Sequence, residues 1–291
     1  MSLAGVEAFY RPDAPEGVVE LLEKHSDSAL IVAGGTFLHG LIARGLLTGI
    51  EALIDIQHLG LDYINNSADG TEIGAMTRFS AIKASPEVQS QAWLGAIRDA
   101  VEYPPAQVMN AATVGGCVAS SCPFFDLPVS FLALNAIVNV HGPAGRRDIE
   151  LEAFFPGLFE NALDPAEFVT SLRVAPTSAN TASAFTKLET NANDLALVNV
   201  AVSLATNGAG KCEEARVFVG GGVGETVVRA PSAEQTLTGA VLGPAIFTQA
   251  GDAAKADVDP IADHRASAEY RTAMVKVLLE RTLQRAADRL S

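Results

Sequence analysis

The sequence predicts an α+β protein of about two domains, and three observations support this class. The chain has 291 residues, and a domain commonly has roughly 100–200. Its first 57 residues alternate short apolar runs with helical patterns, which is typical of a small α/β unit. Its second half has three consecutive strand-like runs followed by helical patterns, which indicates an antiparallel meander and helices.

Composition and charge exclude several classes of protein. Apolar residues make up 48% of the chain and charged residues 19%, which is ordinary for a globular protein and excludes a disordered one. The net charge of −14 repels phosphate groups, so neither nucleic acid nor an anionic membrane surface is an expected partner. No apolar run reaches membrane-spanning length. Three cysteines and the absence of a signal-peptide pattern favour a cytoplasmic protein without disulfides.

Apolar periodicity and turn residues give the expected elements in chain order. In the N-terminal part, Pro15 suits the first turn of a helix whose apolar face includes Val18, Leu21 and Leu22. Short apolar runs before and after this helix predict strands. The N-terminal elements are strands over 2–10, 29–33 and 52–56 and helices over 15–24 and 37–47.

The middle of the chain predicts a hairpin, two helices and two further strands. Asn65 to Gly70 has turn chemistry between two alternating runs. Pro104-Pro105 ends the next helix, and a long loop of small residues follows, with Gly115-Gly116 at its centre. The middle elements are strands over 61–64, 71–75, 136–140 and 169–174, helices over 93–101 and 129–134, and the loop over 106–128.

The C-terminal part begins after a linker of small polar residues over 177–181. Ser267 is the expected N-cap of the last helix, which carries one apolar stripe. That stripe consists of Val275, Leu279, Leu283, Ala286 and Leu290. The C-terminal elements are strands over 184–188, 195–206 and 212–219 and helices over 232–237, 244–255 and from 267 onward.

Several motifs with known chemistry are incomplete in this chain. The glycine run over 220–224 lacks the last glycine of a dinucleotide fingerprint, because Glu225 stands there, so a structural turn is predicted. Gly208 to Cys212 resembles the end of a phosphate-binding loop but lacks its first glycine and its hydroxyl, so a hairpin turn is predicted. No two histidines share a helical spacing, so no metal site is expected.

The segment from Ile31 to Leu38 is the first candidate binding site. It runs from an apolar strand through Gly34-Gly35-Thr36 into a helix. Glycines let the backbone approach a ligand, and the start of a helix offers unpaired N–H groups with a partial positive charge. The pattern therefore predicts an anion site, although a glycine turn without a ligand has the same sequence.

The second candidate is Thr113-Val114-Gly115-Gly116-Cys117, which lies in the long loop of small residues. Long loops inside a compact domain are usually functional. Two such glycine segments in an acidic protein predict that backbone N–H groups, rather than Lys or Arg, neutralise a diphosphate.

These segments, in this order, resemble the FAD-binding medium subunit of molybdenum hydroxylases of the carbon monoxide dehydrogenase and xanthine dehydrogenase type. The residues that carry the resemblance extend over nearly the whole chain. They are A-G-G-T at 33–36, Q-V-M-N-A-A-T-V-G-G at 107–116, S-C-P-F-F-D-L-P at 121–128, F-F-P-G at 154–157 and A-R-V-F-V-G-G-G-V-G at 215–224. One glycine pair is a weak signal, whereas the ordered set is specific.

The resemblance implies an FAD-binding fold of two α/β subdomains, of the PCMH or vanillyl-alcohol-oxidase type, followed by an α+β C-terminal domain. The implied boundaries are 1–176 for the FAD-binding domain, with subdomains of about 1–57 and 58–176, and 177–291 for the C-terminal domain. FAD is expected between the two subdomains, with its diphosphate at the two glycine segments.

The resemblance also implies which residues bind FAD. Asp126 is expected at the ribityl or ribose hydroxyls, and Tyr103 near the flavin ring, with core packing as its alternative role. Val169 and Lys187 are looser assignments, and for Lys187 the alternative is a solvated charge. The expected cofactor-binding residues are Ile31, Val32, Ala33, Gly34, Gly35, Thr36, Phe37, Leu38, Tyr103, Thr113, Val114, Gly115, Gly116, Cys117, Asp126, Val169 and Lys187. No catalytic residue and no metal ligand is expected on this chain.

Three residues depart from the family pattern. Met109 replaces a common Arg, Cys117 replaces an Asn or Ser, and Cys122 replaces an Asp. The first change removes one charged contact. A small buried residue is the alternative interpretation of Cys117. Placed near a flavin, the two thiols would be open to oxidation.

The implied function is electron transfer from iron–sulfur clusters on a partner subunit, via FAD, to an external acceptor. The expected partners, in a cytoplasmic hetero-oligomer, are a large molybdopterin-binding subunit and a small 2Fe–2S subunit. NAD, oxygen and a quinone all stay open as the acceptor. Two alternatives also stay open: a free-standing FAD-dependent oxidoreductase of the same fold and a flavin-free scaffold.

Overall fold

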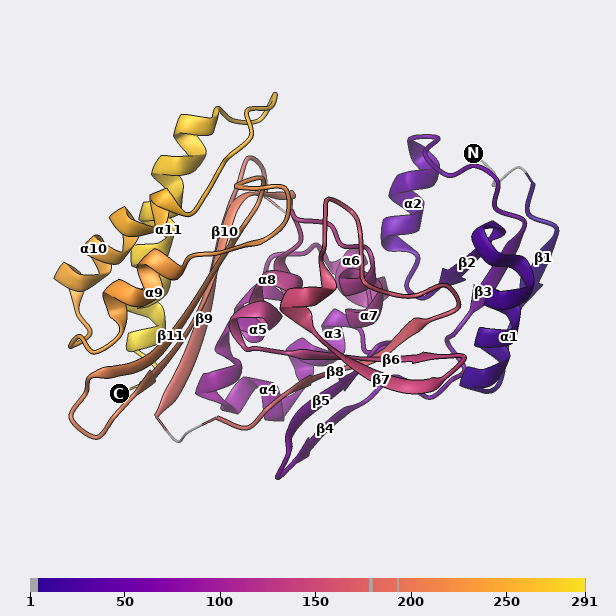
Figure 1. The fold of residues 1–291 in the computed structure, drawn as a ribbon, viewed down its shortest axis with the longest axis horizontal. Helices are drawn as coiled ribbons and strands as arrows, with labels where there is room; N and C mark the ends of the chain where they lie inside the picture. Colours follow the sequence, from indigo (N-terminus) through magenta and orange to yellow (C-terminus); the bar gives the residue numbers. More distant parts are fainter. Residues whose placement is uncertain (1–4, 178–179, 193, 291) are drawn as a thin grey trace.

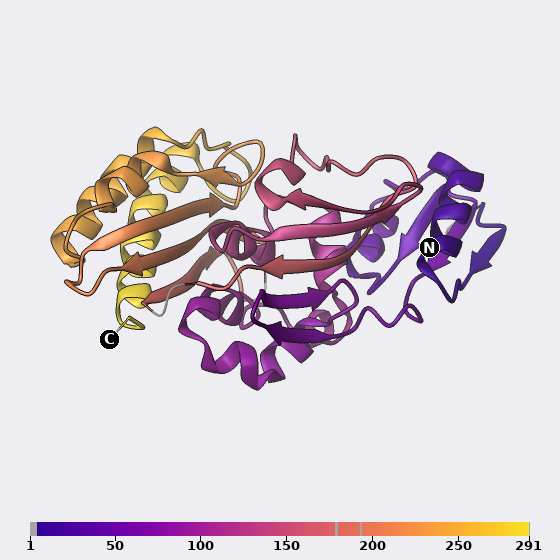
Figure 2. The same cartoon turned by 60° about the horizontal axis from the view of Figure 1, so that its bottom comes forward.

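The computed structural model describes residues 5–177, 180–192 and 194–290. Three sheets follow one another along an elongated molecule, with the N-terminal sheet at one end and the C-terminal sheet at the other (Figure 1, Figure 2). The predicted α+β class is confirmed. Within the described ranges, no helix combines the length and the apolar character needed to cross a membrane.

The N-terminal subdomain is built on a three-stranded parallel sheet in the order β1-β3-β2. Pro15 opens α1, and Val18 and Val19 on this helix are buried in one cluster with Ile54 of β3. Phe168 of the next sheet completes that cluster, so the two sheets share apolar contacts. The elements are β1 (Ala8–Tyr10), α1 (Pro15–His25), η1 (Ser26–Ser28), β2 (Ala29–Val32), α2 (Thr36–Ala43) and β3 (Ala52–Asp55).

Two predictions for this subdomain need correction or restriction. Helix α2 ends at Ala43 rather than at residue 47, and Gly45 beyond it takes a left-handed conformation with φ +66°. None of the eight residues of α2 is buried, although most are apolar. Of the predicted strand over 2–10, residues 8–10 form β1, and residues 2–4 lie outside the described residues.

The middle subdomain contains a five-stranded antiparallel sheet in the order β4-β5-β8-β6-β7, with short helices on one face (Figure 2). The predicted hairpin is confirmed, with a two-residue turn, because pairing extends to Ser67 and Gly70. The edge strand β7 is absent from the predicted elements, because its sequence is mostly charged and exposed. The strands are β4 (Ile64–Ser67), β5 (Gly70–Gly74), β6 (Ile137–Gly142), β7 (Gly145–Glu150) and β8 (Phe168–Val174). The helices are α3 (Phe79–Ala84), α4 (Pro86–Ser90), η2 (Ala92–Leu94), α5 (Gly95–Ala100), α6 (Ala106–Ala111), α7 (Val114–Ala119), α8 (Asp126–Ala133) and η3 (Leu151–Phe154).

The predicted loop over 106–128 is wrong, because this stretch forms α6, α7 and the start of α8. Thr113 caps α7, and its hydroxyl accepts a hydrogen bond from the Gly116 N–H at 3.2 Å. Gly115 lies inside this helix, where an added Cβ would be 2.5 Å from the Cβ of Ala75, just after β5. The glycine pair therefore serves close packing of a helix on a strand rather than a turn.

The C-terminal domain contains a four-stranded antiparallel sheet in the order β12-β11-β10-β9. One face packs against α9 and α11, and the other against α5 and α8 of the middle subdomain (Figure 1). The predicted N-cap is confirmed, since Ser267 accepts from the Tyr270 N–H at 3.2 Å. The strands are β9 (Thr181–Glu189), β10 (Ala196–Thr206), β11 (Cys212–Gly220) and β12 (Val228–Arg229), and the helices are α9 (Pro231–Leu237), α10 (Pro244–Ala253), η4 (Ala254–Ala256) and α11 (Ala268–Ala287). The predicted linker includes residues 178 and 179, which lie outside the described residues, and the division at 176/177 stays a prediction.

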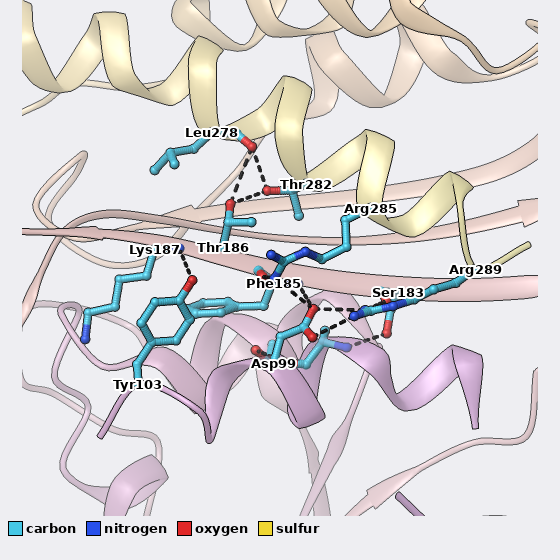
Figure 3. A network of polar contacts seen from close by, with 12 residues as sticks. Asp99, Tyr103, Ser183, Phe185, Thr186, Lys187, Leu278, Thr282, Arg285 and Arg289 are labelled. Atoms are coloured by element: carbon cyan, nitrogen blue, oxygen red, sulfur yellow. Dashed lines mark hydrogen bonds and ion pairs between the residues drawn. The ribbon is translucent and has the colours of Figure 1, made fainter. Parts of the chain in front are cut away.

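Strand β9 is the free edge of this sheet, and side chains from outside the sheet bind its outward backbone groups (Figure 3). Asp99 of α5 accepts a hydrogen bond from the Phe185 N–H at 3.0 Å. Tyr103, which follows α5, accepts one from the Lys187 N–H at 3.2 Å. These contacts keep the edge from pairing with another strand and fix the C-terminal sheet to the middle subdomain.

Asp99 is the centre of this contact between domains. It is 8% exposed, and its carboxylate accepts from Arg289 at 2.7 and 2.9 Å, with Arg285 at 3.6 Å (Figure 3). Arg289 also donates to the Ser183 carbonyl of β9 at 2.6 Å. The end of the chain is thereby bound to both α5 and β9.

Replacing Asp99 by Asn should lower the free energy of unfolding by about 2–4 kcal/mol, because an amide leaves Arg289 without its counter-charge. Urea denaturation followed by circular dichroism measures the change. Glu102→Gln is the matched control, since Glu102 pairs with Lys83 at 2.6 Å on the surface, where such pairs contribute about 0–1 kcal/mol. Equal losses in the two variants would contradict a domain contact that depends on Asp99.

Candidate functional site

Two glycine segments from different subdomains meet at one place. An added Cβ on Gly34 would lie 1.9 Å from the carbonyl oxygen of Ala111 and 3.1 Å from the Cα of Ala112. An added Cβ on Gly116 would lie 3.8 Å from the Cβ of Ala33. The segment before α2 is therefore packed against the end of α6 and the start of α7, and only glycine fits at position 34.

The first segment leads from β2 into α2 and leaves the start of that helix open. Gly35 precedes α2 with φ +71°, and no side chain caps the helix. The first hydrogen bond of the helix runs from the His39 N–H to the Gly35 carbonyl at 2.8 Å. The N–H groups of residues 36–38 come before it and have no partner within the helix. A Cβ added to Gly35 would meet no atom within 4 Å, so the space beside it is open. This end of α2 fits an anion.

The second segment uses its N–H groups within the protein. Gly115 donates to the carbonyl of Ala75 at 2.8 Å, and Gly116 donates to the Thr113 hydroxyl at 3.2 Å. Val114 donates at 3.0 Å to a backbone carbonyl just before α3. In the second pair these N–H groups therefore have partners within the protein, because α7 packs directly on the end of β5, and the expectation that both pairs bind a diphosphate stays a prediction. The Thr113 hydroxyl still has its proton to donate.

Other predicted residues come together where α8 meets the C-terminal sheet. The Lys187 ammonium binds Asp126 at 3.0 Å and Glu189 at 3.2 Å, and its side chain is 4% exposed. It also lies 5.4 Å from the centre of the Tyr103 ring. Asn199 of β10 donates to Asp126 at 2.9 Å. The alternative of a solvated charge is thus wrong for Lys187.

The carboxylate of Asp126 already has hydrogen-bond partners within the protein. Burial raises the pKa of its carboxyl, while the charge of Lys187 and the hydrogen bond from Asn199 act in the opposite direction. Each of its oxygens accepts one hydrogen bond. Its role as a ligand of FAD hydroxyls stays a prediction. Phe125, the preceding residue, contacts Phe37 of α2 edge-on with ring centres 5.7 Å apart, which links this cluster to the first segment.

Three further residues pack in the core of the middle subdomain. Val169 is 5% exposed in β8 and belongs to that core. Tyr103 packs edge-on against Phe185 with ring centres 5.7 Å apart, which supports its core-packing alternative alongside its hydrogen bond to β9. Met109 packs against the same core and brings no charge there.

Two polar residues, one beside Asp126 and one beside Thr113, are not among the predicted site residues. Asn199 interrupts an apolar run, and an isolated amide in a buried strand is a usable signal because it needs hydrogen-bond partners. Arg78 forms an antiparallel bridge with Thr113, which brings it beside the second segment. That pairing joins distant positions of the chain, so nothing local in the sequence indicates it.

All three cysteines are buried free thiols. Burial raises the pKa of Cys117 well above its ordinary value and raises the pKa of Cys122 and of Cys212 to about 11. They are therefore thiols rather than thiolates at neutral pH. This agrees with the interpretation of Cys117 as a small buried residue, and not with an oxidisable pair.

Two family models together match most of the chain. Residues 4–177 match the FAD binding domain in molybdopterin dehydrogenase. The chain belongs to this flavoprotein family. Residues 183–286 match the CO dehydrogenase flavoprotein C-terminal domain, so both parts of the molybdopterin dehydrogenase flavoprotein are present in this order.

Relatives of this molybdopterin dehydrogenase flavoprotein are similar over their full length. The chain is 31% identical over 284 residues to the carbon monoxide dehydrogenase medium chain of Afipia carboxidovorans, covering 97% of this chain and 96% of that one. It is 30% identical over 279 residues to the 6-hydroxypseudooxynicotine dehydrogenase complex subunit alpha of Paenarthrobacter nicotinovorans, covering 95% and 93%.

A solved structure of the cyanide-inactivated Cu,Mo-CO dehydrogenase matches with a TM-score of 0.92 and 31% identity, covering 99% of this chain and 100% of that one. The predicted FAD-binding fold with its C-terminal domain is thus confirmed. The chain is an oxidoreductase component, and its cofactor is FAD. The open start of α2 fits the diphosphate of that cofactor.

Replacing Gly34 by Ala should weaken FAD binding by about tenfold or more, because the new Cβ overlaps the Ala111 carbonyl and overpacking costs about 1–3 kcal/mol. The measurement is the FAD content per purified chain. Gly40→Ala is the control, since its Cβ would meet only the end of the Arg44 side chain at 3.3 Å, and alanine favours the helix. Full FAD content in the Gly34 variant would contradict the close contact.

A thiol-specific reagent should find no reactive cysteine in the native protein at neutral pH and all three after denaturation. The thiolate is the reactive form, so the native labelling rate should increase only as the pH rises toward about 11, the pKa of Cys122 and Cys212. Labelling rates measured across this range check the direction. Rapid labelling at neutral pH would show that a thiol is accessible and ionised.

Proposed function

We propose that the chain is the FAD-binding electron-transfer subunit of a molybdenum hydroxylase complex. It takes electrons from iron–sulfur clusters on a partner subunit and passes them to an external acceptor. The observation that carries this proposal is the open start of α2, packed against the end of α6 through Gly34, in a chain with the family's FAD-binding domain. Bound FAD supplies the redox chemistry, since its ring accepts and releases electrons.

The backbone of the first segment holds the diphosphate in this proposal. The N–H groups of Thr36, Phe37 and Leu38 donate to it, and the dipole of α2 favours its negative charge. Thr113 donates its hydroxyl proton from the facing segment. The other residues proposed to line this part of the site are Ile31, Val32, Ala33, Gly34, Gly35, Val114, Gly115, Gly116 and Cys117.

In this proposal, the cluster of Lys187, Asp126, Glu189 and Asn199 serves the half of the cofactor that carries the flavin ring. Lys187, held between Asp126 and Glu189, would be a hydrogen-bond donor fixed in place near the flavin. Tyr103 orients that part of the site through its contacts with Lys187 and the strand that carries it. Val169 contributes to the wall of the site from β8. The hydrogen bonds and ion pairs of this cluster support the proposal because they fix these groups before the cofactor arrives.

The chain is one subunit of a multi-subunit dehydrogenase, as its full-length relatives are a medium chain and a complex subunit. We infer that its partners are a large molybdopterin-binding subunit and a small 2Fe–2S subunit. NAD, oxygen or a quinone receives the electrons. A cytoplasmic location is supported by three buried, unpaired thiols, since cysteines stay reduced there.

The purified chain should show a flavin absorption spectrum and release FAD, identified by its mass, on denaturation. After anaerobic chemical reduction, one of NAD, oxygen and a soluble quinone should restore the oxidised spectrum much faster than the other two. The isolated chain should oxidise no organic substrate. A colourless chain that also refuses added FAD would contradict the proposal, and reduction of its flavin by a small organic substrate alone would favour a free-standing oxidoreductase.

A further inference from the structure

Arg78 is paired with the second glycine segment by a short antiparallel contact. The Val114 N–H donates to the Thr77 carbonyl at 3.0 Å, and the Phe79 N–H donates to the Ala112 carbonyl at 3.3 Å. Arg78 therefore stands directly opposite Thr113. Residues that face each other in an antiparallel pair extend their side chains on the same side, so the Arg78 side chain emerges on the side of the Thr113 hydroxyl.

The guanidinium of Arg78 is free to bind a ligand. Its residue is exposed, and in the described parts of the chain no carboxylate or other side chain bonds to it. Ala112, on the facing segment, is also adjacent to Gly34, whose added Cβ would lie 3.1 Å from the Ala112 Cα. Arg78 thus stands beside the place where the two glycine segments touch.

A cation at this site would balance the negative charge of the diphosphate. The first segment offers the N–H groups of residues 36–38, but the second segment has already used those of Val114, Gly115 and Gly116. The whole chain has a net charge of −14, so its long-range field opposes an anionic ligand. Lys187 already forms ion pairs with Asp126 and Glu189. Of the described groups in the two glycine segments, the start of α2 and the Thr113 hydroxyl stay available to a diphosphate.

We propose that Arg78 is a further FAD-binding residue, whose guanidinium donates hydrogen bonds to the phosphate oxygens from the side opposite α2. This inference rests on the proposed function, because it requires FAD at the two glycine segments. Arginine suits the task, since its planar donors match the geometry of phosphate and keep their charge at every physiological pH. The diphosphate is then held between the start of α2 and a side chain of the middle subdomain.

The test measures FAD binding to the full-length, FAD-depleted chain at low and at high salt. Arg78→Gln should raise the dissociation constant by about ten- to a hundredfold at low salt, since a charge-assisted hydrogen bond is lost. It should also reduce the dependence of binding on salt, because screening acts on the charge that was removed. Arg78→Lys should restore part of the affinity and most of the salt dependence.

Arg146→Gln is the matched control. Arg146 is likewise exposed, but it lies on the edge strand β7, opposite His141. This variant should bind FAD as the unchanged chain does, and circular dichroism should show both variants folded. Unchanged affinity in Arg78→Gln, or a loss that is the same at every salt concentration, would overturn the role of Arg78. If the unchanged chain binds no FAD at all, the proposed function fails first and this inference with it.

Discussion

The backbone of Gly34 lies so close to the Ala111 carbonyl that a single added carbon would overlap it. This contact joins the small parallel sheet to the middle subdomain where α2 begins and α6 ends, while the shared cluster of Val18, Ile54 and Phe168 also holds the two sheets together. The cofactor site depends on that arrangement. Because the two segments touch, an open helix start and a capping hydroxyl from separate subdomains lie close together, and in the proposed function both bind the diphosphate of FAD.

Strand β9 connects this site to the C-terminal domain. Phe185 is fixed at the strand edge by Asp99, and two residues later Lys187 reaches Asp126. Residues two apart on a strand extend their side chains on the same face, so Phe185 and Lys187 both face the middle subdomain, where they contact Tyr103 and Asp126. The contact between domains at Asp99 and the ion pair between Lys187 and Asp126 therefore depend on the same strand.

Much of the fold could be predicted from the sequence because its signals are local. Apolar runs identify β2, β3, β10 and β11, and Ser267 marks the start of α11. The two glycine pairs show what local sequence cannot predict. Both look like turns, yet Gly35 opens a helix to its surroundings and Gly115 is buried inside one, and only the neighbouring strand decides between these cases. The position of Arg78 beside the site could not be predicted for the same reason, since its pairing with Thr113 is a contact between distant segments.

In the proposed site α2, and not α7, supplies the backbone donors for FAD. Residue-resolved amide hydrogen exchange, with and without FAD, tests it most directly. Without FAD, the amides of residues 36–38 should exchange rapidly, and those of 114–116 slowly, because the latter are bonded within the protein. FAD should protect residues 36–38 and leave 114–116 nearly unchanged. Protection by FAD confined to residues 114–116 would contradict the account.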